Sequence, residues 1–182
     1  MKARSPELLV VSDSHGDIAV LQGILEWGRK RGIGAVAFLG DGCADLPAAA
    51  DRAGFHPPNK RVRGNGDFDH SLPFFDILEF AGKRFFLCHG HLHGVAEGFG
   101  PLVAAARSLG ADAALFGHTH RAFWDELDGM LVLNPGSPSR PRGPKPTFAT
   151  ITVPSEGWFV VRHWALGRGA LGGWIMRETE LI

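Results

Sequence analysis

Five short polar motifs, each just after an apolar run, constrain this chain more than any other feature. The runs are LLVV, AVAFL, RV, RFFLC and AALF, and the motifs after them are DSH, GD, GNGD, HGH and GHTH. Such short apolar runs are typical of buried parallel strands, and open α/β sheets place their sites in the loops at the carboxyl ends of these strands. The sequence therefore predicts five strand ends that deliver polar side chains to one rim.

The side chains in these motifs are those of a metal centre. Six of the nine histidines lie in the loops that carry these motifs, at positions 15, 89, 91, 93, 118 and 120. In an extended segment, two histidines at a spacing of two, such as His118 and His120, point to the same side. Oxygen and imidazole ligands suit Mn, Fe, Zn or Mg, and two close metals are a common means of displacement at phosphorus. Each motif alone fits ordinary turn or cap chemistry, but together they indicate a metal cluster.

Helix and strand signals alternate in the first half of the chain and hairpin signals dominate the second. The expected helices are 18–31, with Asp17 as N-cap and Gly32 as the stop, 46–53 and 95–109. The expected strands are 8–12, 35–39, 60–62, 74–80, 84–89, 113–116, 122–127, 130–133, 147–153 and 158–164. We expect an α/β fold, an αββα sandwich in which two packed mixed sheets are flanked by helices.

Length and composition agree with an ordinary globular protein. A chain of 182 residues predicts a single domain, 1–182, in which the Gly-rich segment 165–182 stays unplaced. Nineteen basic and nineteen acidic side chains cancel, so no overall charge attracts nucleic acid or an anionic membrane. Cys43 and Cys88 are expected to be buried thiols of a reducing compartment. No apolar stretch is long enough for a membrane span or a signal peptide, so we expect a cytoplasmic protein.

The ordered set D-x-H, GD, GN-x-D, H-G-H and GHTH resembles the calcineurin-like metallophosphoesterase superfamily from residue 8 to about 150. Within it, SDSHG, GHTH and NPGSPSRPR are similar to the YfcE-type phosphodiesterases, whose fold is shared by the retromer subunit Vps29. The resemblance implies two divalent metal ions, with Mn first and Fe, Zn, Ni or Mg as alternatives. It implies that one metal is bound by Asp13, His15 and His120, that the second is bound by Asn65, His89 and His118, and that Asp41 bridges both.

One position departs from the family pattern. Many members have His directly after the Asn, and YfcE-like members commonly have Cys, whereas this chain has Gly66. Glycine cannot protonate a leaving group, so His91 is the first candidate for the general acid and His93 the second. Asp67 is expected to orient a ligand.

The Pro-rich stretch GSPSRPRGPKP leaves two interpretations open. Arg140, Arg142 and Lys145 form either a cationic rim that guides phosphate to the metals or a stiff, solvated surface loop. Phe68 and Trp124 are expected in the core or an interface.

The function hypothesis is a dinuclear phosphoesterase, and within that class a phosphodiesterase, in which a metal-bridging hydroxide attacks phosphorus in line with the leaving oxygen. Its partner would be a small phosphoester, and self-association into a homo-oligomer stays open. A non-catalytic interaction scaffold on the same fold is the first alternative, and a nuclease is the second, which the neutral charge disfavours.

Overall fold

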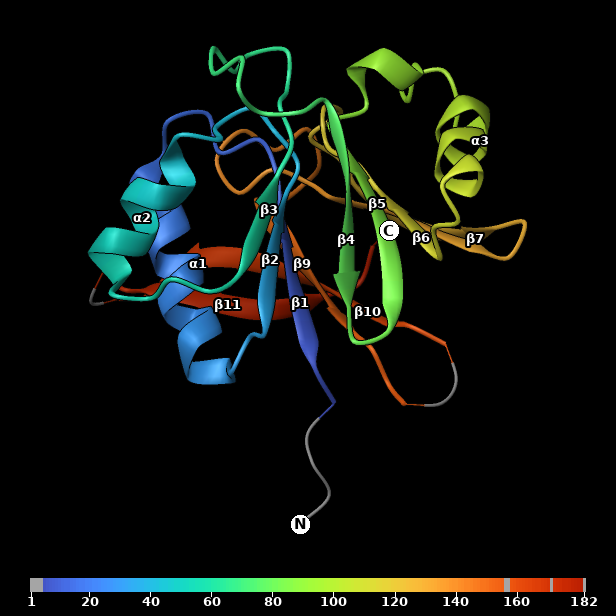
Figure 1. The fold of residues 1–182 in the computed structure, drawn as a ribbon. Coiled ribbons are helices and arrows are strands. Elements are labelled where there is room, and N and C mark those ends of the chain that lie inside the picture. The colour runs from blue at the N-terminus through green and yellow to red at the C-terminus, as the bar shows by residue number, and fades with distance from the viewer. Residues whose placement is uncertain (1–4, 156–157, 171, 182) are drawn as a thin grey trace.

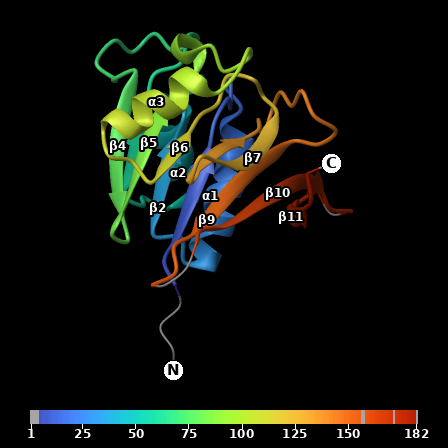
Figure 2. The same ribbon diagram turned by 90° about the vertical axis from the view of Figure 1, so that its right-hand side faces the viewer.

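The computed structural model describes residues 5–155, 158–170 and 172–181 as two mixed sheets packed face to face (Figures 1 and 2). The first sheet has six strands in the order β11-β10-β9-β1-β2-β3. Strands β1, β2 and β3 are parallel, while β9, β10 and β11 continue the sheet in antiparallel pairs. The bounds are β1 Glu7–Val11, β2 Ala35–Phe38, β3 Asn59–Arg61, β9 Thr147–Thr152, β10 Val160–Arg168 and β11 Trp174–Thr179.

The second sheet has five strands in the order β4-β5-β6-β8-β7. Its centre, β5, β6 and β8, is parallel, and β4 and β7 close its edges as hairpin partners of β5 and β8. The bounds are β4 Phe75–Phe80, β5 Lys83–Cys88, β6 Ala113–Leu115, β7 Ala122–Leu127 and β8 Met130–Pro135.

Helices cover the outer faces of both sheets and complete the expected αββα sandwich. Helices α1 (Ile18–Arg31) and α2 (Asp45–Ala53) lie on the first sheet, and α3 (Gly100–Ser108) lies on the second (Figure 1). Strand β1 shows why its sequence is continuously apolar. Its alternate residues Leu8 and Val10 pack between the sheets, whereas Leu9 and Val11 pack under α1 and α2, so both faces are buried.

Most of the predicted elements are confirmed. Helix α1 begins after Asp17, whose carboxylate accepts the N–H of Val20 at 3.0 Å, and ends at Gly32 in the left-handed conformation. The hairpin turns at Ala81-Gly82 and Asp128-Gly129 have positive φ at both positions, as a two-residue turn requires. The predicted hairpin after residue 153 also pairs, although residues 156–157 of its turn lie outside the described residues.

One expected element is wrong, the unplaced tail is now placed, and two aromatic side chains lie outside the core. The helix predicted over 95–109 begins at Gly100, because residues 94–98 form turns around Gly94 instead. The unplaced tail extends β10 to Arg168 and adds β11, whose Trp174 packs so closely against Gly23 of α1 that a Cβ there would lie 2.2 Å from the ring. Phe68 and Trp124 are 91% and 46% exposed, so neither lies in the core.

The cysteine and membrane expectations can also be compared with the structure. Cys43 and Cys88 are both buried free thiols, as predicted. No described helix combines the length and the hydropathy that crossing a bilayer would demand.

The buried His163 makes stability depend on pH. Its Nε2–H donates to the carbonyl of Asn134 at 2.8 Å, which links the two sheets, and burial lowers the pKa of His163. As pH falls below about 6.5, the unfolded chain binds a proton that the folded chain refuses, so stability decreases. We expect His163→Gln, which keeps an N–H donor, to lose less free energy of unfolding than wild type between pH 7.5 and 5.5 in urea titrations. His56→Gln, at an exposed histidine, is the control. Equal pH dependence in wild type and His163→Gln would contradict this.

Candidate metal centre

The ends of five parallel strands, three from one sheet and two from the other, supply the predicted ligands. Asp13, Asp41 and Asn65 follow β1, β2 and β3, while His89 and His118 follow β5 and β6. Because the two sheets pack face to face, these loops meet at one rim. The central prediction from the sequence, that strand ends gather the polar motifs, is therefore confirmed.

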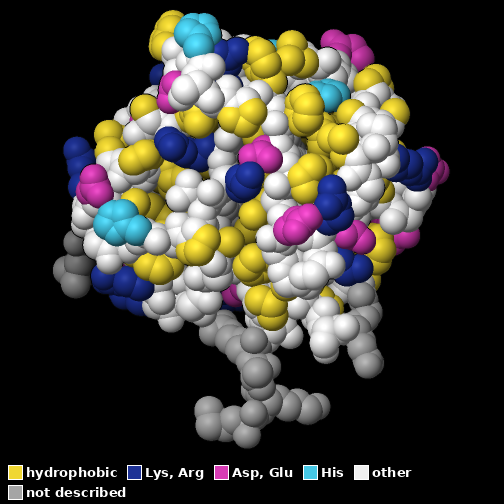
Figure 3. Space-filling view, in the orientation of Figure 1, with side chains coloured by type: hydrophobic (Ala, Val, Ile, Leu, Met, Phe, Trp, Pro, Cys, Tyr) yellow, Lys and Arg dark blue, Asp and Glu magenta, His cyan; other side chains and the backbone are white. Residues whose placement is uncertain are grey.

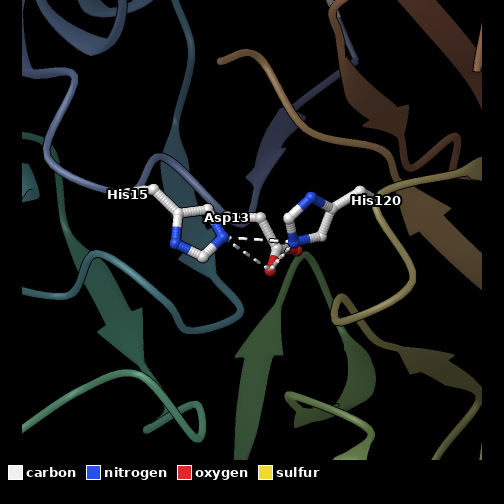
Figure 4. A group of neighbouring side chains, drawn as sticks. All are labelled: Asp13, His15 and His120. Atoms are coloured by element: carbon white, nitrogen blue, oxygen red, sulfur yellow. Dashed lines mark hydrogen bonds and ion pairs between the residues drawn. The ribbon is translucent and has the colours of Figure 1, made fainter. Parts of the chain in front are cut away.

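Asp13, His15 and His120 form a first group of donor atoms (Figure 4). The Nε2 atom of His120 lies 3.2 Å from Oδ1 of Asp13, and Nε2 of His15 lies 3.8 Å from the same oxygen. The two Nε2 atoms are 3.1 Å apart. Three donors that converge in this way could hold one cation.

Asp13, Asp41 and His89 form a second group that shares Asp13 with the first. Nε2 of His89 lies 3.6 Å from Oδ2 of Asp41 and 3.9 Å from Oδ1 of Asp13. Oδ2 of Asp41 is also 3.9 Å from Nε2 of His15, so this carboxylate lies between the two groups. The ring centroid of His118 lies 5.2 Å from the ring centroid of His89.

Asn65 is less well placed than the other expected ligands, since its side chain is exposed. The neighbouring peptide nevertheless reaches the centre, because the N–H of Gly66 donates to Oδ1 of Asp41 at 2.7 Å.

Two donor atoms show that a cation fits here. Oδ1 of Asp13 and Nε2 of His89 are buried and lack a hydrogen-bond partner among the described residues. Burying a carboxylate oxygen and an imidazole nitrogen without partners is costly, and a cation between them removes that cost.

The remaining ring nitrogens orient the imidazoles. Nδ1–H of His89 donates to the carbonyl of Leu39, and Nδ1–H of His120 donates to that of Arg140, each at 2.7 Å. The Nε2 lone pairs are then free to bind metal, which is the usual outer arrangement around a histidine ligand.

The ligand loops hold an unusual backbone conformation. Seven described non-glycine residues have positive φ, and five of them are the expected ligands Asp13, His15, Asp41, His118 and His120. The extended geometry expected for the histidine pairs is therefore wrong. His118 and His120 lie in a left-handed turn that directs one ring toward His89 and the other toward His15. His91 begins a 3₁₀ turn, His91–His93.

His91 still lies beside the centre despite this different backbone. Its ring is 5.3 Å from that of His89 and 6.2 Å from that of His118. Burial lowers the pKa of His91, and the neighbouring His89 and His118 lower it further. The ring of His93 packs on the edge of Phe86, farther along the same turn, and burial lowers its pKa as well.

Asp67 supports the loops without joining either donor group. Its carboxylate accepts four backbone N–H groups at 2.8–2.9 Å, from Asp41, Gly42, Cys43 and Gly64. Burial raises the pKa of Asp67, but these hydrogen bonds outweigh it and the net pKa is lowered. An ionised Asp67 thus ties the loop after β3 to the loop after β2.

Several residues that support the ligand loops were not predicted from the sequence. Ser137 and Ser139, in the loop after β8, donate to the carbonyl of Asp13 at 2.7 and 3.1 Å. Asp45 accepts the hydroxyl of Ser14 and the N–H of Gly16. The signal was present, since GSPS directly follows β8, another parallel strand, and its serines can donate to a neighbouring loop.

Two glycines allow the loops to approach each other. A Cβ on Gly64 would lie 2.1 Å from Oδ1 of Asp41, and one on Gly117 would lie 2.0 Å from Oγ of Ser12. Any larger residue at either position would push the ligand loops apart.

Two clefts border the centre. The polar cleft, about 390 Å³, is lined by His15, Asp41, Asp67, Phe68, Arg140 and neighbours. The aromatic cleft, about 540 Å³, lies beside His118 and Thr119 and is lined by Phe99, Phe116, Phe123, Arg121 and Arg142. One arginine of the Pro-rich loop thus reaches each cleft, while Lys145 lines an adjoining groove that shares Arg121 and Arg142 with the aromatic cleft. Figure 3 shows hydrophobic and histidine side chains mixed along the upper edge of the molecule, where the loops above the strands lie.

Comparison with known protein families shows the family to which the chain belongs. Residues 7–156 match the family described as the calcineurin-like phosphoesterase superfamily domain. The chain belongs to this superfamily. The matched segment contains every expected ligand, from Asp13 to His120.

Named relatives agree with this assignment. The chain is 31% identical over 153 residues to a probable metallophosphoesterase, YsnB of Bacillus subtilis, covering 82% of this chain and 85% of the relative. It is 29% identical to the phosphodiesterase YfcE of Escherichia coli K12, covering 77% and 83%. The fold is also similar to Vps29 of Entamoeba histolytica complexed with Zn²⁺, with a TM-score of 0.72, 21% identity and coverage of 95% and 98%.

The role of Asp67 can be tested through metal affinity. Asn in its place cannot accept all four N–H groups, so the loop carrying Asp41 should loosen. We expect Asp67→Asn to weaken Mn²⁺ binding by roughly 10- to 100-fold in calorimetric titrations. Asp69→Asn, in the same loop and exposed, is the matched control and should bind as wild type does. Unchanged affinity in Asp67→Asn would show that the loops hold without it.

Proposed function

We propose that this protein is a dinuclear metal-dependent phosphodiesterase. The observation that carries the proposal is the pair of donor groups that share Asp13, with Oδ1 of Asp13 and Nε2 of His89 buried and unpartnered among the described residues. Asp13, His15 and His120 would hold one ion. Asn65, His89 and His118 would hold the second, and Asp41, which lies between the groups, would contact both.

The chemistry of the donors limits the metal. Carboxylate, amide and imidazole ligands suit Mn²⁺, with Fe²⁺, Zn²⁺, Ni²⁺ and Mg²⁺ as alternatives. The Zn²⁺ complex of the similar Vps29 supports a divalent cation on this fold. Bound here, the ions would lower the pKa of a water molecule, to give the hydroxide for in-line attack, and neutralise phosphate oxygens.

The residues of this chain have separate tasks. The buried carboxylates Asp13 and Asp41 set the negative charge that attracts the cations. Arg140 and Arg142, which line the two clefts, supply guanidinium groups suited to phosphate. Because Gly66 cannot donate a proton, His91, whose ring centroid lies 5.3 Å from that of His89, is the candidate proton donor to the leaving oxygen. A lowered pKa makes it a stronger acid but reduces its charged fraction at neutral pH.

The alternatives explain less of the structure. A protein-interaction scaffold on the same fold does not need five ligand residues in strained left-handed backbone. A nuclease would need a basic surface for its polyanion, and the chain has no net charge. We therefore favour a small phosphodiester substrate, and expect the reaction to take place in the cytoplasm.

The position of Asp41 between the donor groups generates the main test. Wild type with Mn²⁺ should hydrolyse 4-nitrophenyl methyl phosphate, and EDTA should abolish this activity. Asp41→Asn removes a charge but can still accept the N–H of Gly66. We expect it to lose about 100-fold or more in kcat/KM and at least one bound metal by elemental analysis. Asp51→Asn, at an exposed aspartate, is the control. Full metal occupancy and normal turnover in Asp41→Asn would refute a dinuclear centre.

His91 can be tested by varying the leaving group. A poor alkyl leaving group needs protonation, whereas 4-nitrophenolate does not. We expect His91→Ala to slow hydrolysis of a dialkyl phosphate by about 10²-fold or more, with little effect on the nitrophenyl ester and with metal content retained. His93→Ala, at the second candidate for the general acid on the same 3₁₀ turn, is measured in parallel, and a selective loss there with none in His91→Ala would assign the role to His93. Equal losses on both substrates would assign His91 to phosphate or metal binding instead.

A further inference from the structure

The aromatic cleft is built differently from the polar cleft on the other side of the centre. Phe99 precedes α3, Phe116 follows β6 and Phe123 lies on β7, and the three rings line one cleft. Figure 2 turns α3, β6 and β7 toward the viewer. Phe99 and Phe123 are stacked with centroids 4.7 Å apart and planes at 28°, and the ring of Phe116 lies 5.4 Å from that of Phe99. Val95 and Ala96 complete an apolar lining.

Two of the three rings that line the aromatic cleft are accessible to a ligand. Phe116 is buried, but Phe99 and Phe123 are only partly so, and both remain open to the cleft. A volume of about 540 Å³ lies within the usual range for small-molecule sites. Partly exposed phenylalanine rings beside an open space offer flat surfaces on which another ring can stack.

The polar end of the cleft indicates what such a ring is attached to. His118, a proposed metal ligand, and Thr119 form the end nearest the centre, while Arg121 and Arg142 are exposed along the rim. An anionic group held at the centre would therefore have two cations and an aromatic surface on this side. The polar cleft carries the carboxylates of Asp41, Asp67 and Asp69 and a single phenylalanine ring, the exposed Phe68, so it offers an aromatic substituent no comparable cluster of rings.

We propose that the aromatic cleft binds an aromatic ring of the phosphoester substrate, with Phe99 and Phe123 as the residues that select it. This inference rests on the proposed function, and it narrows the substrate class to esters that carry an aryl or heteroaryl group. Aliphatic esters would still reach the metals but would leave the cleft unfilled.

Binding measurements can test the cleft without turnover. Phenylphosphonate and methylphosphonate carry the same anionic head group and differ only in the substituent. With Mn²⁺-loaded wild type, calorimetry should show phenylphosphonate binding about tenfold more tightly. Phe99→Ala and Phe123→Ala should each remove most of that preference, with methylphosphonate affinity unchanged. Phe123→Leu keeps an apolar side chain but no ring, and should also lose the preference if the alanine variant does not fold.

Trp124→Ala is the matched control, because Trp124 follows Phe123 on β7 but lines a groove with Val161 and Arg162 on the other side of the strand. It should keep the wild-type preference. Equal affinity of wild type for the two phosphonates would overturn the proposal that the cleft binds an aromatic ring. An equal loss of affinity for both phosphonates in the Phe99 and Phe123 variants would overturn it as well.

Hydrolysis of 4-nitrophenyl methyl phosphate with Mn²⁺ separates the two proposals. Hydrolysis of this ester, together with equal binding of the two phosphonates, would refute aryl binding in the cleft but retain the proposed phosphodiesterase activity. If binding prefers the aryl ligand and this preference depends on Phe99 and Phe123, but no ester is hydrolysed, the result would support aryl binding in the cleft and refute the proposed phosphodiesterase activity.

Discussion

The fully buried carboxylate of Asp13 is the constraint on which the centre depends. Its backbone N–H donates to Gly40, its carbonyl accepts from Ser137 and Ser139, and its Oδ2 accepts the N–H of His118 at 3.1 Å. These contacts join the loops after β1, β2, β6 and β8. The remaining oxygen, Oδ1, faces His15, His89 and His120. A buried carboxylate whose remaining oxygen faces three imidazoles favours a compensating cation, which would couple the architecture of the loops to metal binding.

Contacts between the loops also maintain the strained backbone of the ligand residues. Left-handed backbone is unfavourable for Asp and His, and it persists only where surrounding contacts over-determine it. Asp67 supplies one such set of contacts through four N–H groups, and the β8 loop supplies another. Tight turns point successive side chains in different directions. The two histidines of the short motif GHTH therefore diverge, with the ring of His120 beside His15 and the ring of His118 beside His89.

The surroundings of the centre are asymmetric, and this asymmetry gives the proposed substrate an orientation. Acidic side chains and exposed backbone surround the polar cleft, so water can reach the centre from that side. Three phenylalanine rings line the opposite side, beyond His118. The Pro-rich loop after β8 spans both, since its arginines line one cleft each and the carbonyl of Arg140 orients His120. The loop thus contributes charge, ligand orientation and backbone support at the same time.

The sequence by itself determined the layers, the strand ends and the ligand types. Apolar runs with two buried faces identify parallel strands, and local signals such as Asp17 and Gly32 set helix ends, because both depend on a few neighbouring residues. Strand β11 was not predicted, because it follows a Gly-rich turn and depends on the packing of Trp174 against α1, which leaves little local signal. Only the tertiary structure decided which histidine faces which carboxylate, that Asp67 holds two loops together, and that Phe99, Phe116 and Phe123 meet beside His118. These are contacts between residues far apart in the chain, and their geometry follows from the packing of the two sheets and from backbone strain that no local pattern encodes.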